Sequence, residues 1–289
     1  MIRSPLRYPG GKSRAIKQIA KYLPKSFLEY REPLVGGGSV FFHIKQTLPN
    51  IQYWINDLNE DLYCFWKVAQ SNLQQLVEEI EYRRDTYVDG KALFEELTSN
   101  DINFEGLTSD ERAVRFFILN RITFSGTVEA GGFSKEAFEK RFTYSSIERL
   151  ADLKKVLPDV RITNFDYSVL LEEPGQDVFI FLDPPYLGAT KSRLYGKRGN
   201  LHTSFDHQRF SKLMRKCSHK WMITYDDSEE IVQSFKDFAY IYKWELQYGM
   251  NNYKQDKAAK GKELIITNYE VNLDLDSPTP RQLSLNLFP

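Results

Sequence analysis

The sequence of 289 residues predicts an α/β fold in which a helical insertion interrupts a mostly parallel, doubly wound sheet. Three observations predict this. Before residue 60, the chain reads as a strand, a glycine-rich loop, a helix and a second strand that ends at an acid. The stretch 60–159 then reads mainly as helices. An unbroken apolar run at Val178–Leu182 is typical of a central strand that is buried on both faces.

The first elements follow from local patterns. Apolar residues recur at helical spacing over 13–23, where Ser13 suits the N-cap position. Strands are expected at 27–32 and Gln52–Asn56, with a helix at 40–46 between them. This order is that of the first half of a nucleotide-binding βαβ unit.

The later elements divide the chain into a discontinuous domain and an insertion. The helical period returns at 60–84 and the polar stretch 85–145 also reads as helical, so we place the insertion at 60–159. Strand-like runs then return at 160–163, 178–183, 221–225 and 263–269. We therefore expect one domain that is built from residues 1–59 and 160–274.

Composition excludes several classes of protein. Hydrophobic residues make up 42% of the chain, with 20 Phe and 17 Tyr, which suits a large core and argues against disorder. No apolar run reaches the roughly 18–20 residues of a membrane helix, and the basic N-terminus lacks the apolar stretch of a secretory signal. Cys64 and Cys217 make neither a disulfide framework nor a zinc site, so we expect a cytoplasmic protein without a metal.

Charge is unevenly distributed although the net charge is zero. Residues 1–28 contain seven Lys and Arg and no acid, whereas residues 57–111 contain fourteen acids and four bases. Residues 184–220 contain nine bases and one acid. This asymmetry indicates a positive face that attracts a polyanion, although ordinary fluctuation along the chain is the alternative.

The segment Asp183-Pro184-Pro185-Tyr186 directly follows the buried strand, where ligands bind in open α/β sheets. Two prolines stiffen the chain and leave carbonyl oxygens as acceptors, and Asp183 adds a carboxylate. Beside them, the Tyr186 ring offers a flat surface for stacking. The combination suits a planar substrate with an amino group, such as adenine. A structural turn at the end of the strand is the alternative.

Two glycine-containing segments bear on the cofactor. Glycines at 36–38 permit a tight turn and close approach of a ligand, and Asp57 follows at a strand end, where a carboxylate can accept from ribose hydroxyls. The pair predicts a cofactor that contains a nucleoside. Gly11-Lys12-Ser13 resembles the end of a P-loop, but Leu6 stands where that motif requires its first glycine, which argues against ATP hydrolysis.

Five segments occur in the order found in one enzyme family. They are Arg-Tyr-Pro-Gly-Gly-Lys (7–12), Glu-Pro-Leu-Val-Gly-Gly-Gly-Ser-Val (32–40), Ile-Asn-Asp-Leu-Asn-Glu-Asp-Leu (55–62), Leu-Asn-Arg (119–121) and Asp-Pro-Pro-Tyr (183–186). Over residues 4–270 the chain resembles the Dam-type adenine-specific DNA methyltransferases. The resemblance implies a Rossmann-like fold that uses S-adenosylmethionine, with an inserted, mainly helical target-recognition domain. It also implies methyl transfer to the N6 amine of a flipped adenine in a short double-stranded DNA motif.

The resemblance implies roles for individual residues. Those that match the catalytic motif are Asp183, Pro184, Pro185 and Tyr186. Those that match the family's cofactor site are Tyr8, Lys12, Glu32, Pro33, Gly36, Gly38, Asp57, Phe165, Asp166 and Asp183. Among these, Asp57 matches the ribose ligand and Phe165 is placed to stack on the cofactor adenine. Neither cysteine lies in a motif, so no covalent nucleophile is expected.

Two regions are candidates for DNA contacts. Asn120, Arg121 and Phe124 match the hairpin region of the recognition domain, either as contacts or as support for them. After Gly126 the chain reads Thr-Val-Glu-Ala-Gly-Gly-Phe-Ser, where GATC-specific members carry an arginine, which puts GATC specificity in doubt. Basic residues after the catalytic motif predict a loop that grips phosphates, with a solvated surface loop as the alternative. They are Lys191, Arg193, Lys197, Arg198 and Arg209.

The C-terminal residues 275–289 are rich in Ser, Pro, Thr and Gln and are expected to form a mobile tail. Within it, the run from Gln282 to Phe288 resembles the peptide by which bacterial replication proteins bind the sliding clamp. Such a peptide would order as its apolar side chains enter a pocket. An apolar tail packed on its own domain is the alternative.

Three other functions compete with DNA adenine methylation. An RNA base as acceptor is one, although the large insertion argues against the smaller RNA enzymes. A protein glutamine is another, although the enzymes that methylate glutamine have the motif Asn-Pro-Pro-Tyr, so Asp183 argues against this acceptor. The last is a non-catalytic DNA-binding relative.

Overall fold

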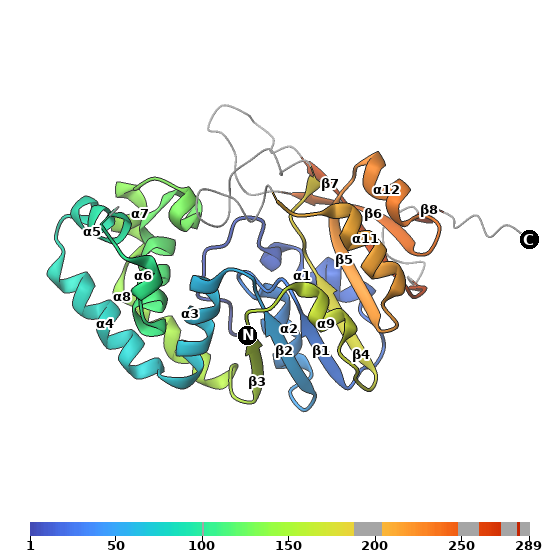
Figure 1. The fold of residues 1–289 in the computed structure, drawn as a ribbon, viewed down its shortest axis with the longest axis horizontal. Coiled ribbons are helices and arrows are strands. Elements are labelled where there is room, and N and C mark those ends of the chain that lie inside the picture. Colours follow the sequence, from blue (N-terminus) through green and yellow to red (C-terminus); the bar gives the residue numbers. More distant parts are fainter. Residues whose placement is uncertain (100, 188–203, 248–259, 273–281, 284–289) are drawn as a thin grey trace, which may run out of the picture.

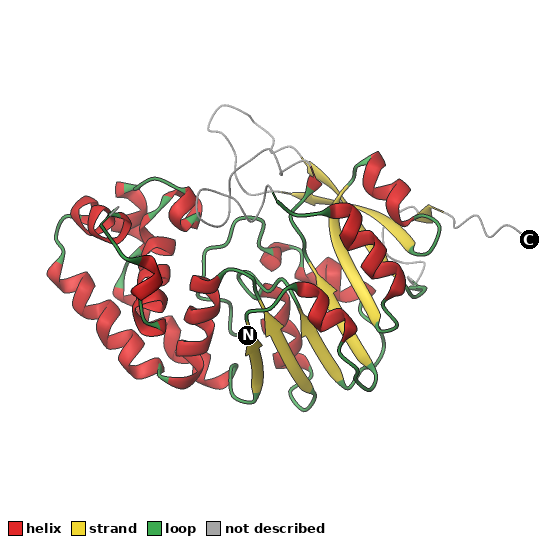
Figure 2. Ribbon diagram, viewed as in Figure 1, coloured by secondary structure: helices red, strands yellow, loops and turns green. Residues whose placement is uncertain are grey.

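The computed structural model describes the whole chain except residues 100, 188–203, 248–259, 273–281 and 284–289. Within the described parts, one eight-stranded sheet has the strand order β3-β2-β1-β4-β5-β7-β6-β8. Helices cover it and also form a separate group to one side (Figures 1 and 2). The α/β fold expected from the sequence is confirmed.

Five adjacent strands are parallel, which matches the doubly wound prediction. They are β1 (Glu29–Glu32), β2 (Gln52–Asn56), β3 (Val160–Thr163), β4 (Val178–Leu182) and β5 (Lys220–Asp226). Because consecutive strands run in the same direction, the segments that follow β1, β2, β3 and β4 all emerge at one edge of the sheet. The glycine loop, Asp57 and Asp183 therefore meet there.

The other three strands are antiparallel and complete the sheet. They are β6 (Tyr240–Gln247), β7 (Lys260–Thr267) and β8 (Gln282–Leu283). The apolar runs in the sequence did not predict β6, in which Lys243 and Glu245 interrupt the apolar residues. The predicted tail falls outside the described residues apart from Gln282 and Leu283, which pair with β6.

Strand β4 shows why its sequence is apolar throughout. Phe179 and Phe181 belong to one hydrophobic cluster, whereas Val178, Ile180 and Leu182 belong to a second cluster. Successive side chains of a strand point to opposite faces, so both faces of the sheet are covered. The flanking helices include α2 (Ser39–Thr47), α9 (Tyr167–Glu172), α11 (His207–Lys216) and α12 (Glu229–Phe235).

The N-terminal helix expected over 13–23 is broken. Its place is taken by three short pieces, η1 (Lys12–Arg14), α1 (Ile16–Ile19) and η2 (Ala20–Tyr22). Pro24 disfavours helical geometry at the residue before it, and Leu23 is extended. Apolar spacing therefore identified the buried face of this segment but not its length.

The stretch 60–159 forms a group of helices beside the sheet, on the left in Figure 1. The α-helices are α3 (Glu60–Ser71), α4 (Leu73–Thr86), α5 (Gly90–Thr98), α6 (Ser109–Ile122), α7 (Lys135–Arg141) and α8 (Tyr144–Glu148). The 3-10 turns are η3 (Phe104–Gly106), η4 (Phe124–Gly126), η5 (Val128–Ala130) and η6 (Arg149–Lys155). The helix predicted over 60–84 is divided at Asn72 into α3 and α4. None of the described helices combines the length and apolarity needed to cross a membrane.

Candidate active site

A cavity of about 470 Å³ lies where the segments after β1, β2, β3 and β4 come together. Its walls include the segments 8–12, 34–40, 57–59 and 183–186, together with Glu32, Asp166 and Arg209. Three segments that are far apart in the sequence, namely the N-terminal motif, the glycine loop and Asp-Pro-Pro-Tyr, therefore share one cavity. Most residues that the sequence singled out for a cofactor or for catalysis line it.

The glycine loop packs directly against Tyr8. A Cβ atom on Gly36 would come 2.7 Å from Cε1 of Tyr8, and one on Gly37 would come 2.7 Å from its Cβ. Gly36 and Gly38 also have positive φ angles, 48° and 68°, which side chains disfavour. Glycine is therefore required by both backbone geometry and space, and the loop can lie close to a ligand.

Asp57 holds the glycine loop in place. Its Oδ2 accepts a hydrogen bond from the Gly36 N–H at 2.9 Å, and its Oδ1 accepts from the Asn59 N–H at 3.0 Å. Burial raises the pKa of Asp57 to about 6, although these backbone bonds oppose the shift. The carboxylate retains acceptor capacity for hydroxyl groups in the cavity.

Glu32 is the most strongly perturbed carboxylate of the cavity wall. It is 3% exposed and its Oε2 accepts a hydrogen bond from the Tyr30 hydroxyl at 2.5 Å. Burial raises the pKa of Glu32 to about 8, with the negative charges of Asp183 and Asp57 adding to the effect. A cation bound beside such a buried carboxyl group would stabilise its ionised form and lower its pKa.

Asp183 is held by two partners that lie far from it in the sequence. Lys12 Nζ lies 2.7 Å from Asp183 Oδ2 and also donates to the Gly10 carbonyl at 3.0 Å. The Thr224 hydroxyl of β5 donates to Asp183 Oδ1 at 2.6 Å. The sequence named Lys12 for this site but gave no signal for Thr224, which lies within an apolar strand.

Tyr186 completes this wall of the cavity. The Lys12 ammonium lies 4.8 Å from the centroid of its ring, within the range of a cation–π contact. Burial, together with the negative charges of Asp183 and Glu263, holds the pKa of Tyr186 well above its ordinary value. The ring is thus fixed beside the carboxylate, an arrangement that suits a flat base with an amino group.

A family model described as D12 class N6 adenine-specific DNA methyltransferase matches residues 8–250. The chain belongs to this family. It is an adenine-specific DNA methyltransferase with a Rossmann-like fold, and it acts on double-stranded DNA. The family is one of methyltransferases that use S-adenosylmethionine. The resemblance to the Dam-type enzymes is confirmed.

Curated relatives agree with this assignment over most of the chain. The type II methyltransferase M.MjaIII of Methanocaldococcus jannaschii is 28% identical, covering 93% of this chain and 99% of its own. The type II methyltransferase M1.LlaDCHI of Lactococcus lactis is 24% identical, covering 93% and 96%. The DNA adenine methylase of Haemophilus influenzae is 25% identical over 63% of each chain. A solved rRNA methyltransferase of Streptomyces viridochromogenes has a TM-score of 0.34 and 13% identity, covering 90% of this chain and 85% of its own.

At the rim of the methyltransferase cavity, Asp166 pairs with Arg209. The Arg209 guanidinium donates to both carboxylate oxygens of Asp166, at 3.1 and 2.8 Å. Arg209 lowers the pKa of Asp166 to about 2. The sequence grouped Arg209 with the phosphate-binding loop, but the structure places it in the cavity wall.

Pro33 and Phe165 lie beside the cavity rather than among the residues that line it. Buried Asn56 joins them, because its Nδ2 donates to the Pro33 carbonyl and to the Phe165 carbonyl, each at 2.9 Å. The Phe165 ring is 44% exposed. Their direct contacts with the cofactor stay a prediction, and through Asn56 their backbones connect β1 to the segment after β3.

The hairpin region contains both buried and exposed candidates. Asn120 and Arg121 are 0% and 3% exposed, which favours the alternative of support over direct contact with DNA. The Asn120 side chain bonds to both the N–H and the carbonyl of Arg7, at 3.0 and 2.6 Å, and to the Gly126 carbonyl at 3.2 Å. Phe124, in contrast, is 66% exposed.

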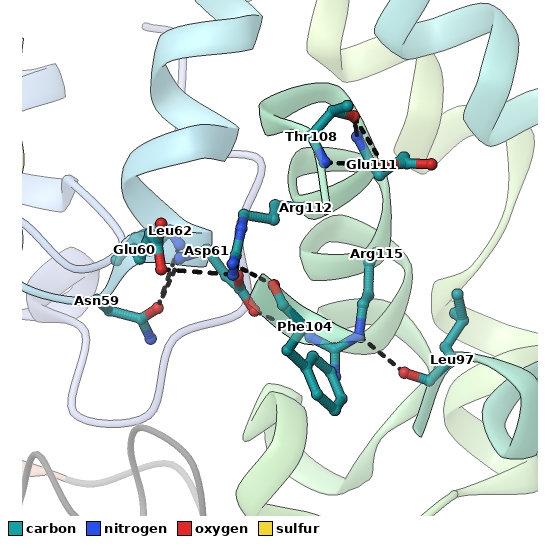
Figure 3. A network of polar contacts seen from close by, with 10 residues as sticks. All are labelled: Asn59, Glu60, Asp61, Leu62, Leu97, Phe104, Thr108, Glu111, Arg112 and Arg115. Carbon is teal, nitrogen blue, oxygen red and sulfur yellow. Dashed lines mark hydrogen bonds and ion pairs between the residues drawn. The ribbon is translucent and has the colours of Figure 1, made fainter. Parts of the chain in front are cut away.

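A largely buried ionic network joins the loop after β2 to the helical part of the methyltransferase (Figure 3). Asp61, in the first turn of α3, accepts from Arg112 at 2.8 Å and from Arg115 at 2.9 Å, both on α6. Asn59 caps the same helix turn and also bonds to Asp57. The loop that carries Asp57 is thus connected to α6 through a short series of polar contacts.

Four predicted phosphate-binding residues lie outside the described residues. They are Lys191, Arg193, Lys197 and Arg198. Their contact with DNA stays a prediction.

Proposed function

We propose that the cavity binds S-adenosylmethionine beside a flipped target adenine, and that Asp183, Pro184 and Tyr186 position the adenine N6 amine for methylation. The observation that carries this proposal is the fixed carboxylate of Asp183. Its two oxygens are held by Lys12 and Thr224, and it lines a cavity that the glycine loop and Asp57 also line.

The residues around the cavity fit the proposed cofactor. S-adenosylmethionine carries a positive sulfonium and ammonium group, and when bound it supplies an electrophilic methyl group. Glu32 is mostly protonated at neutral pH because its pKa is raised to about 8, and a cationic group bound beside it would favour its ionised form. Asp57 offers acceptors for ribose hydroxyls, and Leu34 and Leu58 offer apolar surface in the same cavity. Asp166, which also lines the cavity, would lie near the adenine of the cofactor.

The target adenine must leave the duplex before its amine can reach Asp183, which costs a few kcal/mol. Stacking on Tyr186 offsets this cost. Hydrogen bonds from the two amino hydrogens to Asp183 and the Pro184 carbonyl would favour a tetrahedral nitrogen, which frees its lone pair. The protein's contribution is therefore mainly one of position and electrostatics, with the released proton passing to water.

Sequence specificity is proposed to reside in the loop between Thr123 and Phe133. These two residues form an isolated antiparallel bridge that closes the loop, and Ser125 and Val128 within it have positive φ angles. Phe124 is exposed at its start, where it can contact DNA. Because this loop differs from that of GATC-specific members, we propose that the target is a different motif.

Genome-wide modification sequencing tests the proposal. A methylation-deficient bacterial host would express the chain, with Asp183→Ala as the matched control. Methyladenine at one short motif in the wild type, and none in the control, is the expected result. A soluble wild-type chain that leaves no methyladenine in DNA would contradict it, and RNA would then be tested as the acceptor.

We also propose that the C-terminal segment from Gln282 to Phe288 binds the bacterial sliding clamp. Its first two residues pair with the outer edge of β6, so clamp binding would have to release them. Titration calorimetry would compare the full chain with a chain truncated after residue 281. Equal binding by the two forms would exclude the segment as the clamp ligand.

A further inference from the structure

Glu263 is a buried carboxylate beside the proposed base-binding wall, and it belongs to none of the five sequence segments described above. It lies on β7, directly opposite Asp226 of β5 and Trp244 of β6. Its exposure is 1%, and neither carboxylate oxygen completes a hydrogen bond within the described parts of the chain. An unpaired buried carboxyl group costs free energy, so its presence calls for a function.

The Tyr186 hydroxyl is a candidate hydrogen-bond donor for Glu263. That hydroxyl is also buried and also lacks a completed hydrogen bond among the described residues. The strand geometry brings the two groups together, because the Leu187 N–H beside Tyr186 donates to Asp226 Oδ1 at 3.0 Å and Asp226 lies directly opposite Glu263. In agreement, Glu263 contributes to the raised pKa of Tyr186. A buried acceptor without a donor thus lies near a buried donor without an acceptor.

The charges around Glu263 come from several elements. Lys12 from the N-terminal segment attracts it, whereas Asp183 after β4 and Asp226 on β5 repel it. Asp226 is itself engaged, since its Oδ1 accepts from the Leu187 N–H at 3.0 Å. Tyr186 therefore remains the neighbour that can satisfy Glu263 by a small adjustment.

We propose that Glu263 is a positioning residue for methyl transfer, which holds the Tyr186 hydroxyl and so fixes the ring on which the target adenine stacks. This inference rests on the proposed function of the cavity. A base that enters the cavity presses on the exposed face of the ring. The contact of Glu263 with the hydroxyl resists rotation of the ring, so the amine stays in line with Asp183.

A double-mutant cycle tests the role of Glu263. Methyl transfer to unmethylated genomic DNA would be measured for the wild type, E263L, Y186F and the double variant. We expect E263L to lower the rate about tenfold, the effect of roughly one hydrogen bond, and to have no further effect in the Y186F background. E263Q keeps an amide that can bond to the hydroxyl and should stay near the wild-type rate.

Two outcomes would overturn the proposal. One is a pair of effects that multiply in the double variant, which would show that Glu263 acts independently of the hydroxyl. The other is a marked loss of thermal stability in E263L without DNA, which would assign the residue to the fold. Before a base enters, the carboxyl completes no hydrogen bond with the described residues, so its removal should leave stability equal or higher. The stability test needs no enzyme activity. A wild-type chain without methyl transfer would count against the proposed function instead.

Discussion

The Lys12 ammonium lies 2.7 Å from Oδ2 of Asp183, although 170 residues separate them in the chain. Lys12 is 4% exposed, so this is a largely buried ion pair. The Lys12 charge also acts on Glu263, and Asp183 in turn acts on Glu32. The pair therefore links the N-terminal motif to the Asp-Pro-Pro-Tyr motif both in space and in charge.

Replacement of Lys12 by Met should lower methyl transfer by about a hundredfold, because Asp183 Oδ2 loses the ammonium group that holds it in position. The initial rate with saturating DNA and cofactor measures this. Lys12→Arg keeps the charge and is the matched control, with an intermediate rate expected. A K12M rate equal to that of the wild type would show that Asp183 needs no cation.

Cofactor binding should release a proton at neutral pH. Glu32 has a pKa of about 8 in the cofactor-free protein, and a bound cation would stabilise its ionised form. Affinity for S-adenosylmethionine should thus rise as pH increases from 6.5 towards 8.5. Titration calorimetry in buffers of different ionisation enthalpy counts the protons released. Binding enthalpies that are the same in every buffer would contradict the prediction, and E32Q should abolish the effect.

The same carboxylates make stability depend on pH. The folded-state pKa values of Glu32, Asp57 and Glu263 are about 8, 6 and 7, all above their ordinary values. The folded state therefore binds more protons, so their contribution is complete below about pH 4 and is lost as the pH rises towards 8. Urea unfolding of the cofactor-free protein measures this. In E32Q the free energy of unfolding should decline less steeply above pH 6. An unchanged slope would show that Glu32 does not contribute to this pH dependence.

The sequence predicts the sheet well where local pattern decides the structure. Strands β2 and β3 match their predicted limits, because apolar runs end at polar residues there. Local pattern does not predict the contact between Asp183 and Thr224, since that contact depends on β5 lying next to β4. No local pattern carries strand order, so Thr224 could not be found. The motif around Asn120 likewise identified an important residue but not its buried position.

Asn120→Ala should destabilise the protein rather than weaken DNA contacts directly. The change leaves the Arg7 N–H and two carbonyl groups without a partner, at about 1–3 kcal/mol for each buried group. Urea unfolding would measure the loss. Phe124→Ala is the matched control on the exposed side, where stability should change by less than about 0.5 kcal/mol and DNA affinity should fall. Wild-type stability with weaker DNA binding in N120A would reverse this assignment.

Arg209 gives a test of whether the α11 end of the cavity serves the cofactor or the DNA. Its guanidinium grips Asp166 through two hydrogen bonds, so Arg209→Met should release that carboxylate and weaken S-adenosylmethionine binding. Asp166→Asn should have a similar effect, and the double variant should be no worse than either, because both changes break one contact. DNA affinity and its dependence on salt should stay as in the wild type.

If Arg209 instead neutralises a phosphate, R209M would reduce the slope of log affinity against log salt by about one and leave cofactor binding unchanged. Calorimetry with the cofactor and fluorescence anisotropy with labelled DNA across salt concentrations separate these results, since each role changes one measurement and spares the other.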